Sequence, residues 1–466
     1  MKEMSARLGK EKVGKLLVSL SVPASMGMIV NALYNLVDTI FVGRGVGAIA
    51  IGALTVSFPI QMIIMAFAVM IGMGSASAIS RSLGANNVER ADNVTGNSFF
   101  SIVIFSSIIA ILGLTFTEPL LRLVGATDTI LPYARDYITI IFYGSVFRSF
   151  AMSTNNLIRA EGNAKVAMIS MFIGAGSNII LDPIFIFVFK LGVKGAALAT
   201  IMAQFFAFLY IIRYLYSGKS SLRVRFHHLK PRISIIKEIV TVGMASFFRH
   251  IAGGIAGVII NTSLGFLGGD VALIIVGILH RVTMFVFMPM FGVVQGMQPI
   301  IGFNYGAKKY ERVKETLKIT IMVTTVMAAL GWCFIELFPS LVFSIFTSEV
   351  EVIERGVPII RIVISLIPLI GIQIVAAALF QSLGKAFPSL ILSLLRQVLL
   401  FIPLVIILPR VFGLGIMGIW ISYPIADVLA VILTVFYLRH ELKKMNLWFD
   451  SSVIREELAD SILKND

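Results

Sequence analysis

Hydrophobic residues run in long unbroken stretches along this chain instead of alternating with polar residues at the period of a surface helix or strand. A stretch of about twenty apolar residues is long enough to cross the hydrocarbon core of a membrane as a helix. The predicted spans are residues 16–42, 48–80, 96–121, 132–159, 165–189, 193–216, 234–264, 270–300, 316–345, 356–383, 388–411 and 414–438. The pattern therefore predicts an all-α polytopic membrane protein with about twelve transmembrane helices.

Composition supports a membrane protein and argues against other classes. Of the 466 residues, 58% are hydrophobic and only 14% are charged, and the net charge is +14. The mean hydropathy is +0.93. A basic chain could bind nucleic acid, but the apolar content favours a membrane protein with an excess of basic residues in its cytoplasmic loops. Cys333 is the single cysteine, so no intrachain disulfide can form.

The basic residues also predict the orientation. They precede span one and follow spans two, four, six, eight, ten and twelve, which places them on one side of a twelve-span protein. The opposite loops carry few basic residues, such as Arg44, Lys194 and Arg410. We therefore expect a multi-pass protein of the inner (plasma) membrane with both termini in the cytoplasm.

The chain repeats itself with an offset of 222 residues. Three glycine pairs show this offset: Gly74 with Gly296, Gly84 with Gly306, and Gly162 with Gly384. Each half keeps six spans, so the repeat is parallel, and such halves usually enclose a central binding cavity. The predicted domains are an N-lobe (1–216), a cytoplasmic linker (217–233), and a C-lobe with its cytoplasmic tail (234–466).

Asp38 lies inside the apolar run of span one, and Asp182 lies inside that of span five. An acid at mid-membrane costs roughly 2.5–3.5 kcal/mol on insertion scales, so it is a functional-site candidate by default. A helix rises about 1.5 Å per residue, which puts both acids and Thr200 at similar depths in the outer half of the membrane. The alternative is that the acids only hydrogen-bond neighbouring helices.

Oxygen-bearing side chains flank these acids. Asn178 lies four residues before Asp182, and Tyr34 lies four residues before Asp38, so each pair shares a helix face. Hard oxygen donors suit Na⁺ or H⁺ better than a soft metal. We therefore expect a Na⁺ or H⁺ site at Asp38, Asn178, Asp182 and Thr200, with Tyr34 beside it.

The C-lobe carries an unusual basic set within its spans. Its candidate cavity residues are Arg249, His250, His280, Arg281 and Arg396, with Asp427 as a deep acid. They could line a cavity, pair with Asp427 or bind an anionic substrate group. They could equally satisfy buried carbonyl groups and stabilise the lobe.

Other cavity candidates are uncharged. Met284, Phe287 and Met288 belong to a segment rich in methionine and phenylalanine, which suits a promiscuous apolar cavity or lipid contact. Gln295 lies on the same span. Asn155 and Asn156 on span four could also face the cavity.

Two arginines at the cytoplasmic ends of spans have acidic neighbours in sequence. Arg81 precedes Glu89, and Arg159 precedes Glu161. Pairing within each segment is the expected, structural role. No phosphate loop, zinc spacing or nucleophile elbow is present, so we expect neither an enzyme nor a cofactor.

Four stretches resemble the multidrug and toxic compound extrusion (MATE) family, in its DinF-like prokaryotic branch. They are Pro23 with Tyr34-Asn-Leu-Val-Asp38, Arg81-Ser-Leu-Gly84-Ala, Arg159-Ala-Glu-Gly162-Asn, and Ser177-Asn178-Ile-Ile-Leu-Asp182-Pro183. The resemblance covers nearly the whole chain. It implies two six-helix lobes, cation-coupled drug efflux, and an N-lobe cation site at Asp38, Asn178, Asp182 and Thr200.

Three functions are compared. The leading hypothesis is an antiporter that exports amphipathic, often cationic small molecules and is driven by H⁺ or Na⁺. The alternative is a flippase or exporter of lipid-linked or anionic substrates that uses the C-lobe basic residues. A membrane-embedded enzyme is the third class. The expected partners are drug-like substrates and the lipid bilayer, with no nucleic acid. The sequence leaves the oligomeric state open, and a monomer is the expectation.

Overall fold

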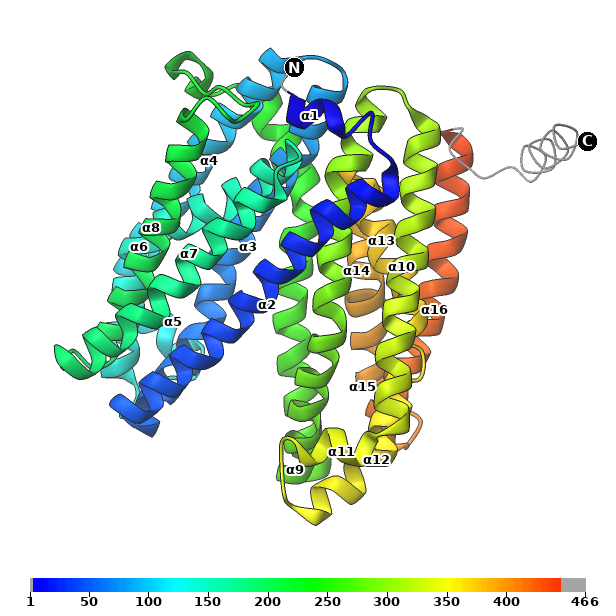
Figure 1. The fold of residues 1–466 in the computed structure, drawn as a ribbon. Coiled ribbons are helices and arrows are strands. Elements are labelled where there is room, and N and C mark those ends of the chain that lie inside the picture. Colours follow the sequence, from blue (N-terminus) through cyan, green and yellow to red (C-terminus); the bar gives the residue numbers. More distant parts are fainter. Residues whose placement is uncertain (1–2, 446–466) are drawn as a thin grey trace, which may run out of the picture.

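The structure is a computed structural model that describes residues 3–445, so the C-terminal tail lies outside the described residues. Figure 1 shows its arrangement as a bundle of helices. The helices are α1 (Glu3–Arg7), α2 (Val13–Gly45), α3 (Ala48–Gly84), α4 (Val88–Thr115), α5 (Thr117–Leu123), α6 (Leu131–Ala160), α7 (Ala164–Pro183), η1 (Ile184–Val188), α8 (Val193–Tyr216), η2 (Phe226–Leu229), α9 (Ile233–Gly306), α10 (Tyr310–Leu337), α11 (Pro339–Ser344), α12 (Val350–Ile364), α13 (Ile367–Ser382), α14 (Ala386–Leu394), η3 (Leu395–Phe401), α15 (Ile402–Arg410) and α16 (Gly415–Lys444).

These helices account for all twelve predicted spans. Among residues 3–445, nine helices are long and apolar enough to cross a membrane, and α12 with α13 forms a further span bent by 46°. Helix α9 is 74 residues long and contains two spans, which meet at Gly269 with a φ of +61°. Helix α6 matches the fourth predicted span and carries four charged side chains. The predicted all-α fold with two six-helix lobes is confirmed.

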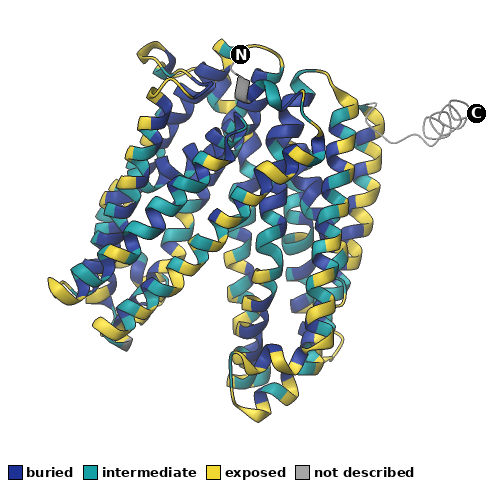
Figure 2. Ribbon diagram, in the orientation of Figure 1, coloured by how far each residue is buried: buried dark blue, intermediate teal, exposed yellow. Residues whose placement is uncertain are grey.

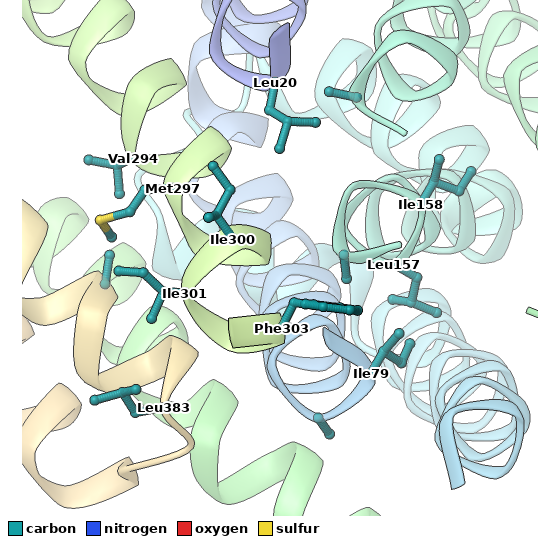
Figure 3. Close-up of a cluster of buried hydrophobic side chains, with 14 of the residues drawn as sticks. Leu20, Ile79, Leu157, Ile158, Val294, Met297, Ile300, Ile301, Phe303 and Leu383 are labelled. Carbon is teal, nitrogen blue, oxygen red and sulfur yellow. The ribbon is translucent and has the colours of Figure 1, made fainter. Parts of the chain in front are cut away.

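The two halves touch at one end and separate toward the other (Figure 1). We call the end with Ser5, Gly84 and Gly306 the closed end, and the end with Gly45 and Gly269 the splayed end. One buried apolar cluster at the closed end takes residues from both halves, including those labelled in Figure 3. Two further clusters draw on one half each, residues 42–197 and residues 264–426. Among residues 3–445, the buried apolar cluster that joins the lobes therefore lies at the closed end.

The outer surface is apolar, as expected of a protein in contact with lipid. Figure 2 shows exposed residues along the outer faces of the helices. Many of these are large hydrophobic side chains, such as Leu36 on α2, Ile111 on α4 and Phe436 on α16. A soluble monomer rarely exposes contiguous apolar patches of this kind.

Glycines let the two halves approach closely at the closed end. A methyl group on Gly84 would overlap the carbonyl oxygen of Phe303, and one on Gly306 would overlap that of Arg81. Gly74 likewise faces the backbone of Ile239. Gly74, Gly84 and Gly306, three of the glycines that mark the sequence repeat, are thus residues at which helices of opposite halves meet.

The segment between the halves is held against the N-lobe. The side chain of Asn97 on α4 donates to the carbonyl of His228 and accepts from the backbone N–H of Arg232. Asp92 accepts from the backbone N–H of Arg223 at 2.7 Å. The predicted linker is therefore an ordered part of the closed end in this structure.

The N-terminal segment contacts both halves. Ser5 donates to Ser221 at 2.7 Å on the N-lobe side. On the C-lobe side, Asn304 donates to the carbonyl of Leu8, and Arg312 donates to that of Glu11. Residues 5–11, the N-terminal strap, thus bridge the lobe boundary.

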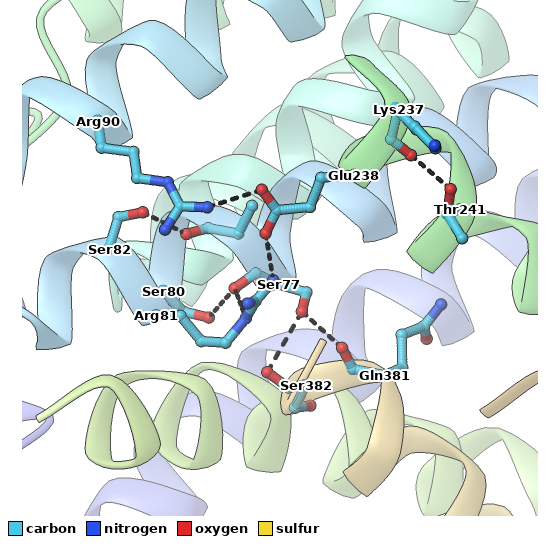
Figure 4. Close-up of polar contacts among 11 residues, drawn as sticks. Ser77, Ser80, Arg81, Ser82, Arg90, Lys237, Glu238, Thr241, Gln381 and Ser382 are labelled. Carbon is cyan, nitrogen blue, oxygen red and sulfur yellow. Dashed lines mark hydrogen bonds and ion pairs between the residues drawn. The ribbon is translucent and has the colours of Figure 1, made fainter. Parts of the chain in front are cut away.

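The expected ion pairs at the closed end were wrong. Arg81 pairs with Glu238 of α9 at 2.8 Å, and the same carboxylate accepts from Arg90 at 2.7 Å (Figure 4). Glu161 instead accepts hydrogen bonds from Tyr214 and Ser220. Sequence proximity failed here because the partners lie on other helices that the fold brings alongside.

Candidate functional site

Asp38 and Asp182 are buried inside the N-lobe. Asp38 lies near the splayed end of α2 and is 8% exposed, and Asp182 lies one residue before the end of α7 and is 0% exposed. Helices α2 and α7 pack against each other. Pro183 follows Asp182, and a π-helical turn over Ile184–Val188 begins directly after it. Such turns are frequent at functional sites because they re-aim side chains.

The two carboxyl groups meet. They lie within hydrogen-bonding distance of each other. Asn178, which is 1% exposed, donates its amide N–H to Asp182 Oδ1 at 3.2 Å. Asp38 Oδ1, Asp182 Oδ2 and Asn178 Oδ1 are buried and accept no hydrogen bond from the described residues. A shared proton or a bound cation would satisfy these oxygens, because buried acceptors without a partner are costly.

Tyr34 and Thr200 differ in how closely they join the pair. Tyr34 on α2 is half-buried and close enough to both acids to interact with them electrostatically. Thr200 on α8 is buried, but none of the hydrogen bonds among residues 3–445 joins it to either carboxyl group. The structure therefore places Asp38, Asp182, Asn178 and Tyr34 together, with Thr200 on a neighbouring helix.

Three polar residues near this pair had no place in the sequence-based site. Arg148 on α6 donates to Gln61 Oε1 on α3 at 2.6 Å. Tyr137 on α6 is buried within hydrogen-bonding reach of Gln61. Its hydroxyl group also interacts electrostatically with Asp38. Arg148 lies deep in the fourth predicted span, so its charge within an apolar run was the signal that could have identified it.

The C-lobe basic residues do not form one cluster. Arg396 pairs with the fully buried Asp427 and lies in the π-helical segment of η3. This is the pairing suggested by the sequence. Arg249 is half-buried, and Arg281 is exposed; neither has a carboxylate within 4.0 Å among the described residues. His280 is exposed as well.

The uncharged candidates also separate. Asn156 and Gln295 line a cavity between the halves, whereas Asn155 accepts a hydrogen bond from Ser170 and so joins α6 to α7. Met284 is exposed, and Phe287 packs against the buried cluster of the C-lobe. A second, apolar cavity beside them takes Phe285, Pro289 and Phe334. Met284, Phe287 and Met288 are not among the residues that line either cavity.

Residues 3–445 contain no group of three or more His, Cys, Asp or Glu side chains that could hold a metal ion. The two acids at Asp38 and Asp182 would therefore need amide or hydroxyl oxygens to complete a cation site. Carboxylate, amide and hydroxyl oxygens can coordinate Na⁺, and H⁺ needs only the carboxyl groups. These oxygen donors therefore suit Na⁺ or H⁺ better than copper or zinc.

A family model matches the chain twice. The MatE model covers residues 23–184 and 247–407. The two starting points are separated by nearly the offset of the glycine repeat, so the duplication is found independently of those glycines. The matches include Asp38, Asn178 and Asp182 in the first copy.

Bacterial multidrug exporters are similar over almost the full length. Multidrug export protein MepA of Staphylococcus haemolyticus is 28% identical over 427 residues, which is 92% of this chain and 93% of that protein. MepA of Staphylococcus aureus is 28% identical over 438 residues, covering 93% and 96%.

Solved structures share the fold. A structure described as that of the MATE multidrug transporter DinF-BH, determined as a complex, is 44% identical, has a TM-score of 0.87, and covers 95% of this chain and 99% of its own. A MATE protein in the bent conformation has a TM-score of 0.91 at 29% identity, with coverage of 96% and 99%. A transporter from Pyrococcus furiosus, whose description assigns a reversed polarity to its binding pocket, has a TM-score of 0.89 at 29% identity, again covering 96% and 99%.

Proposed function

The chain belongs to the MatE family, and from this premise we propose that it is an antiporter that exports amphipathic, often cationic small molecules in exchange for H⁺ or Na⁺. It is a multi-pass bacterial membrane protein whose relatives are multidrug exporters. The coupling ion and the substrates are the parts proposed here.

The contact between Asp38 and Asp182 carries this proposal. Two carboxylates side by side in an apolar pocket repel each other, and their desolvation is costly. A proton shared between them or a Na⁺ ion between them removes that cost. Their buried oxygens without partners give either ion a place to bind.

We place the closed end in the cytoplasm, because the basic loops gather there. The splayed end then faces outward, so the cation site in the N-lobe is reached from outside. Cation binding would reseat α2 near Pro23, which lies inside that helix, and reduce the space left for a substrate in the N-lobe. Proline removes one backbone hydrogen bond, so a change of bend at this position costs little.

The test is transport of a fluorescent cation in proteoliposomes, with Na⁺ and pH gradients imposed separately. Asp38→Asn and Asp182→Asn should each reduce gradient-driven export to background. Asp128→Asn, whose side chain is 90% exposed, is the matched control and should retain export. Full export by either site variant would remove the coupling role from this pair.

The alternative of an anion exporter or flippase has some support in the C-lobe. Arg249 and Arg281 lack carboxylate partners within 4.0 Å in the described part of the chain. The pairing of Arg396 with Asp427 removes one charge from that set. Loss of anion binding on Arg249→Ala with Arg281→Ala, while cationic dyes are still exported, would favour this alternative.

A further inference from the structure

A narrow polar cavity lies between the two halves near the closed end. Residues of α3 and α6 line one side of it, and residues of α9 and α13 line the other. Its polar lining includes Ser77, Asn156, Arg159, Gln295, Gln298 and Gln381. The cavity thus lies on the surface along which the lobes would separate, and three of its amides come from the C-lobe.

Arg159, in the last turn of α6, is the one charged side chain that lines this cavity. Its guanidinium donates to Asn156 Oδ1 at 2.8 Å, and no carboxylate lies within 4.0 Å of it among residues 3–445. A guanidinium has five N–H donors, so most of its capacity remains unused by the described chain.

Other arginines at the closed end do have strong partners. Arg81 is paired with Glu238, and Arg312 donates to the carbonyl groups of Leu8 and Glu11. These contacts hold the two halves or the N-terminal strap in place. Among the described residues, Arg159 makes no such hydrogen bond or ion pair across the boundary, so holding the halves together does not explain its position.

The amide groups opposite Arg159 are also incompletely bonded. Within the described part of the chain, Gln295 Oε1 is buried without a hydrogen-bond partner, and the amide nitrogen donates to the sulfur of Met28 at 3.5 Å. Gln298 donates to Gln381 over a long 3.4 Å. The cavity therefore offers an unused guanidinium together with amides that can donate or accept.

We propose that Arg159, with Asn156 and Gln295 beside it, binds a carboxylate group of the transported molecule. A carboxylate accepts two parallel N–H bonds from a guanidinium, a geometry that an amine or an ester cannot reproduce. The substrates would then include zwitterions, that is, amphipathic amines that also carry an acid. This inference rests on the proposed function and names a substrate class for it.

The position of the cavity between the lobes makes the affinity for the carboxylate depend on whether the closed end is open. In this structure Ser77 on α3 donates to the carbonyl groups of Gln381 and Ser382 on α13, and these bonds join the two halves at the lining of the cavity. Separation of the lobes at the closed end breaks these bonds and widens the cavity around Arg159. Closure then displaces the carboxylate, so affinity is lower once the splayed end is open.

The experiment uses two dyes that differ in one group, a rhodamine as its ethyl ester, which is a cation, and as its free acid, which is a zwitterion. Binding to the purified full-length protein is measured by fluorescence anisotropy, and export is measured in proteoliposomes. Arg159→Gln should weaken binding of the acid by about ten-fold or more and that of the ester by less than about two-fold. Arg159→Lys should lie between these values, because it keeps the charge without the planar fork.

Arg213→Gln is the control variant, since Arg213 is an exposed arginine at the same end. It should change neither dye. An equal loss of both dyes in Arg159→Gln, with a normal melting temperature, overturns the proposal, and so does unchanged binding of the acid. If wild type binds the acid through Arg159 but exports neither dye under any gradient, the site stands and the proposed function fails. If the ester is exported and Arg159→Gln binds the acid as tightly as wild type does, the proposed antiport function stands and the proposed carboxylate site is wrong.

Discussion

Gly84 and Gly306 make reciprocal contacts across the boundary between the lobes. Each faces a backbone carbonyl of the opposite half, that of Phe303 for Gly84 and that of Arg81 for Gly306. The two glycines are related by the 222-residue offset, and so are Arg81 and Phe303. The closed end is thus built around a local two-fold relationship between the repeats.

Alanine at either glycine should loosen the closed end. Gly84→Ala and Gly306→Ala each push a methyl group into a backbone carbonyl that cannot move alone, at a typical cost of about 1–3 kcal/mol. The two variants should lower the melting temperature by similar amounts. Gly254→Ala is the control, because nothing lies within 4 Å of a methyl group there. Unequal effects of the two variants would contradict the symmetric arrangement.

Glu238 should hold the lobes together at this end. It accepts from Arg81 and Arg90 of the N-lobe, and its side chain is 22% exposed. Glu238→Gln should weaken closure by roughly 1 kcal/mol, because partly exposed ion pairs are worth little more. Amide hydrogen exchange in residues 77–90 should rise. The control is Glu311→Gln, whose partner Lys314 lies on the same helix.

Substitution of Asn304 should weaken the attachment of the N-terminal strap to the C-lobe. Its side chain is fully buried and donates to the carbonyl of Leu8 at 2.9 Å. Asn304→Ala leaves that carbonyl without this donor, at a cost of about 1–3 kcal/mol. Faster hydrogen exchange at residues 8–11 is expected, whereas Asn261→Ala at an exposed position of the same helix should leave the strap protected.

The Arg396–Asp427 pair allows a test of structural against functional roles. Asp427→Asn leaves a partly buried guanidinium without its counter-charge, and the stability loss should be about 3 kcal/mol. Arg396→Met combined with Asp427→Leu removes both charges and should recover much of the melting temperature. Recovered stability without recovered export would show that the pair also serves transport. Recovery of both would assign it to packing of the C-lobe.

The hydrogen bond from Tyr214 to Glu161 should contribute more to stability at neutral pH than at acid pH. Burial raises the pKa of Glu161, and the hydrogen bond from Tyr214 at 2.6 Å opposes that rise by favouring the carboxylate. Tyr214→Phe therefore raises the pKa of Glu161 further. Its destabilising effect should be small below the ordinary pKa of a glutamate and should grow as the pH rises. Melting curves of both proteins at pH 4 and pH 7 measure this, and an effect independent of pH would contradict it.

Local patterns in the sequence were enough for the number of spans, their approximate bounds and the two-fold repeat. Span length follows from the thickness of the hydrocarbon core, and the repeat is a property of spacing alone. Asn178 and Asp182 could also be placed on one helix face, because a separation of four residues is nearly one helical turn.

Which buried polar groups pair with one another could be seen only in the tertiary structure. The sequence placed Asp38 and Asp182 at one depth, but only the packing of α2 against α7 brings their carboxyl groups together. Arg81 has a nearer acid in sequence, Glu89, but pairs with Glu238. Glu161, two residues after Arg159, accepts from Tyr214 and Ser220 instead. Gln61, Tyr137 and Arg148 come from three separate stretches of α3 and α6.

The sequence by itself therefore determined that this chain is a duplicated, twelve-span membrane protein with acids at membrane depth, because hydropathy and spacing act along the chain. Only the tertiary structure decided which charges pair, which oxygens stay without partners, and where the lobes touch. Those outcomes depend on the rotation and tilt of each helix, which its packing against neighbouring helices sets.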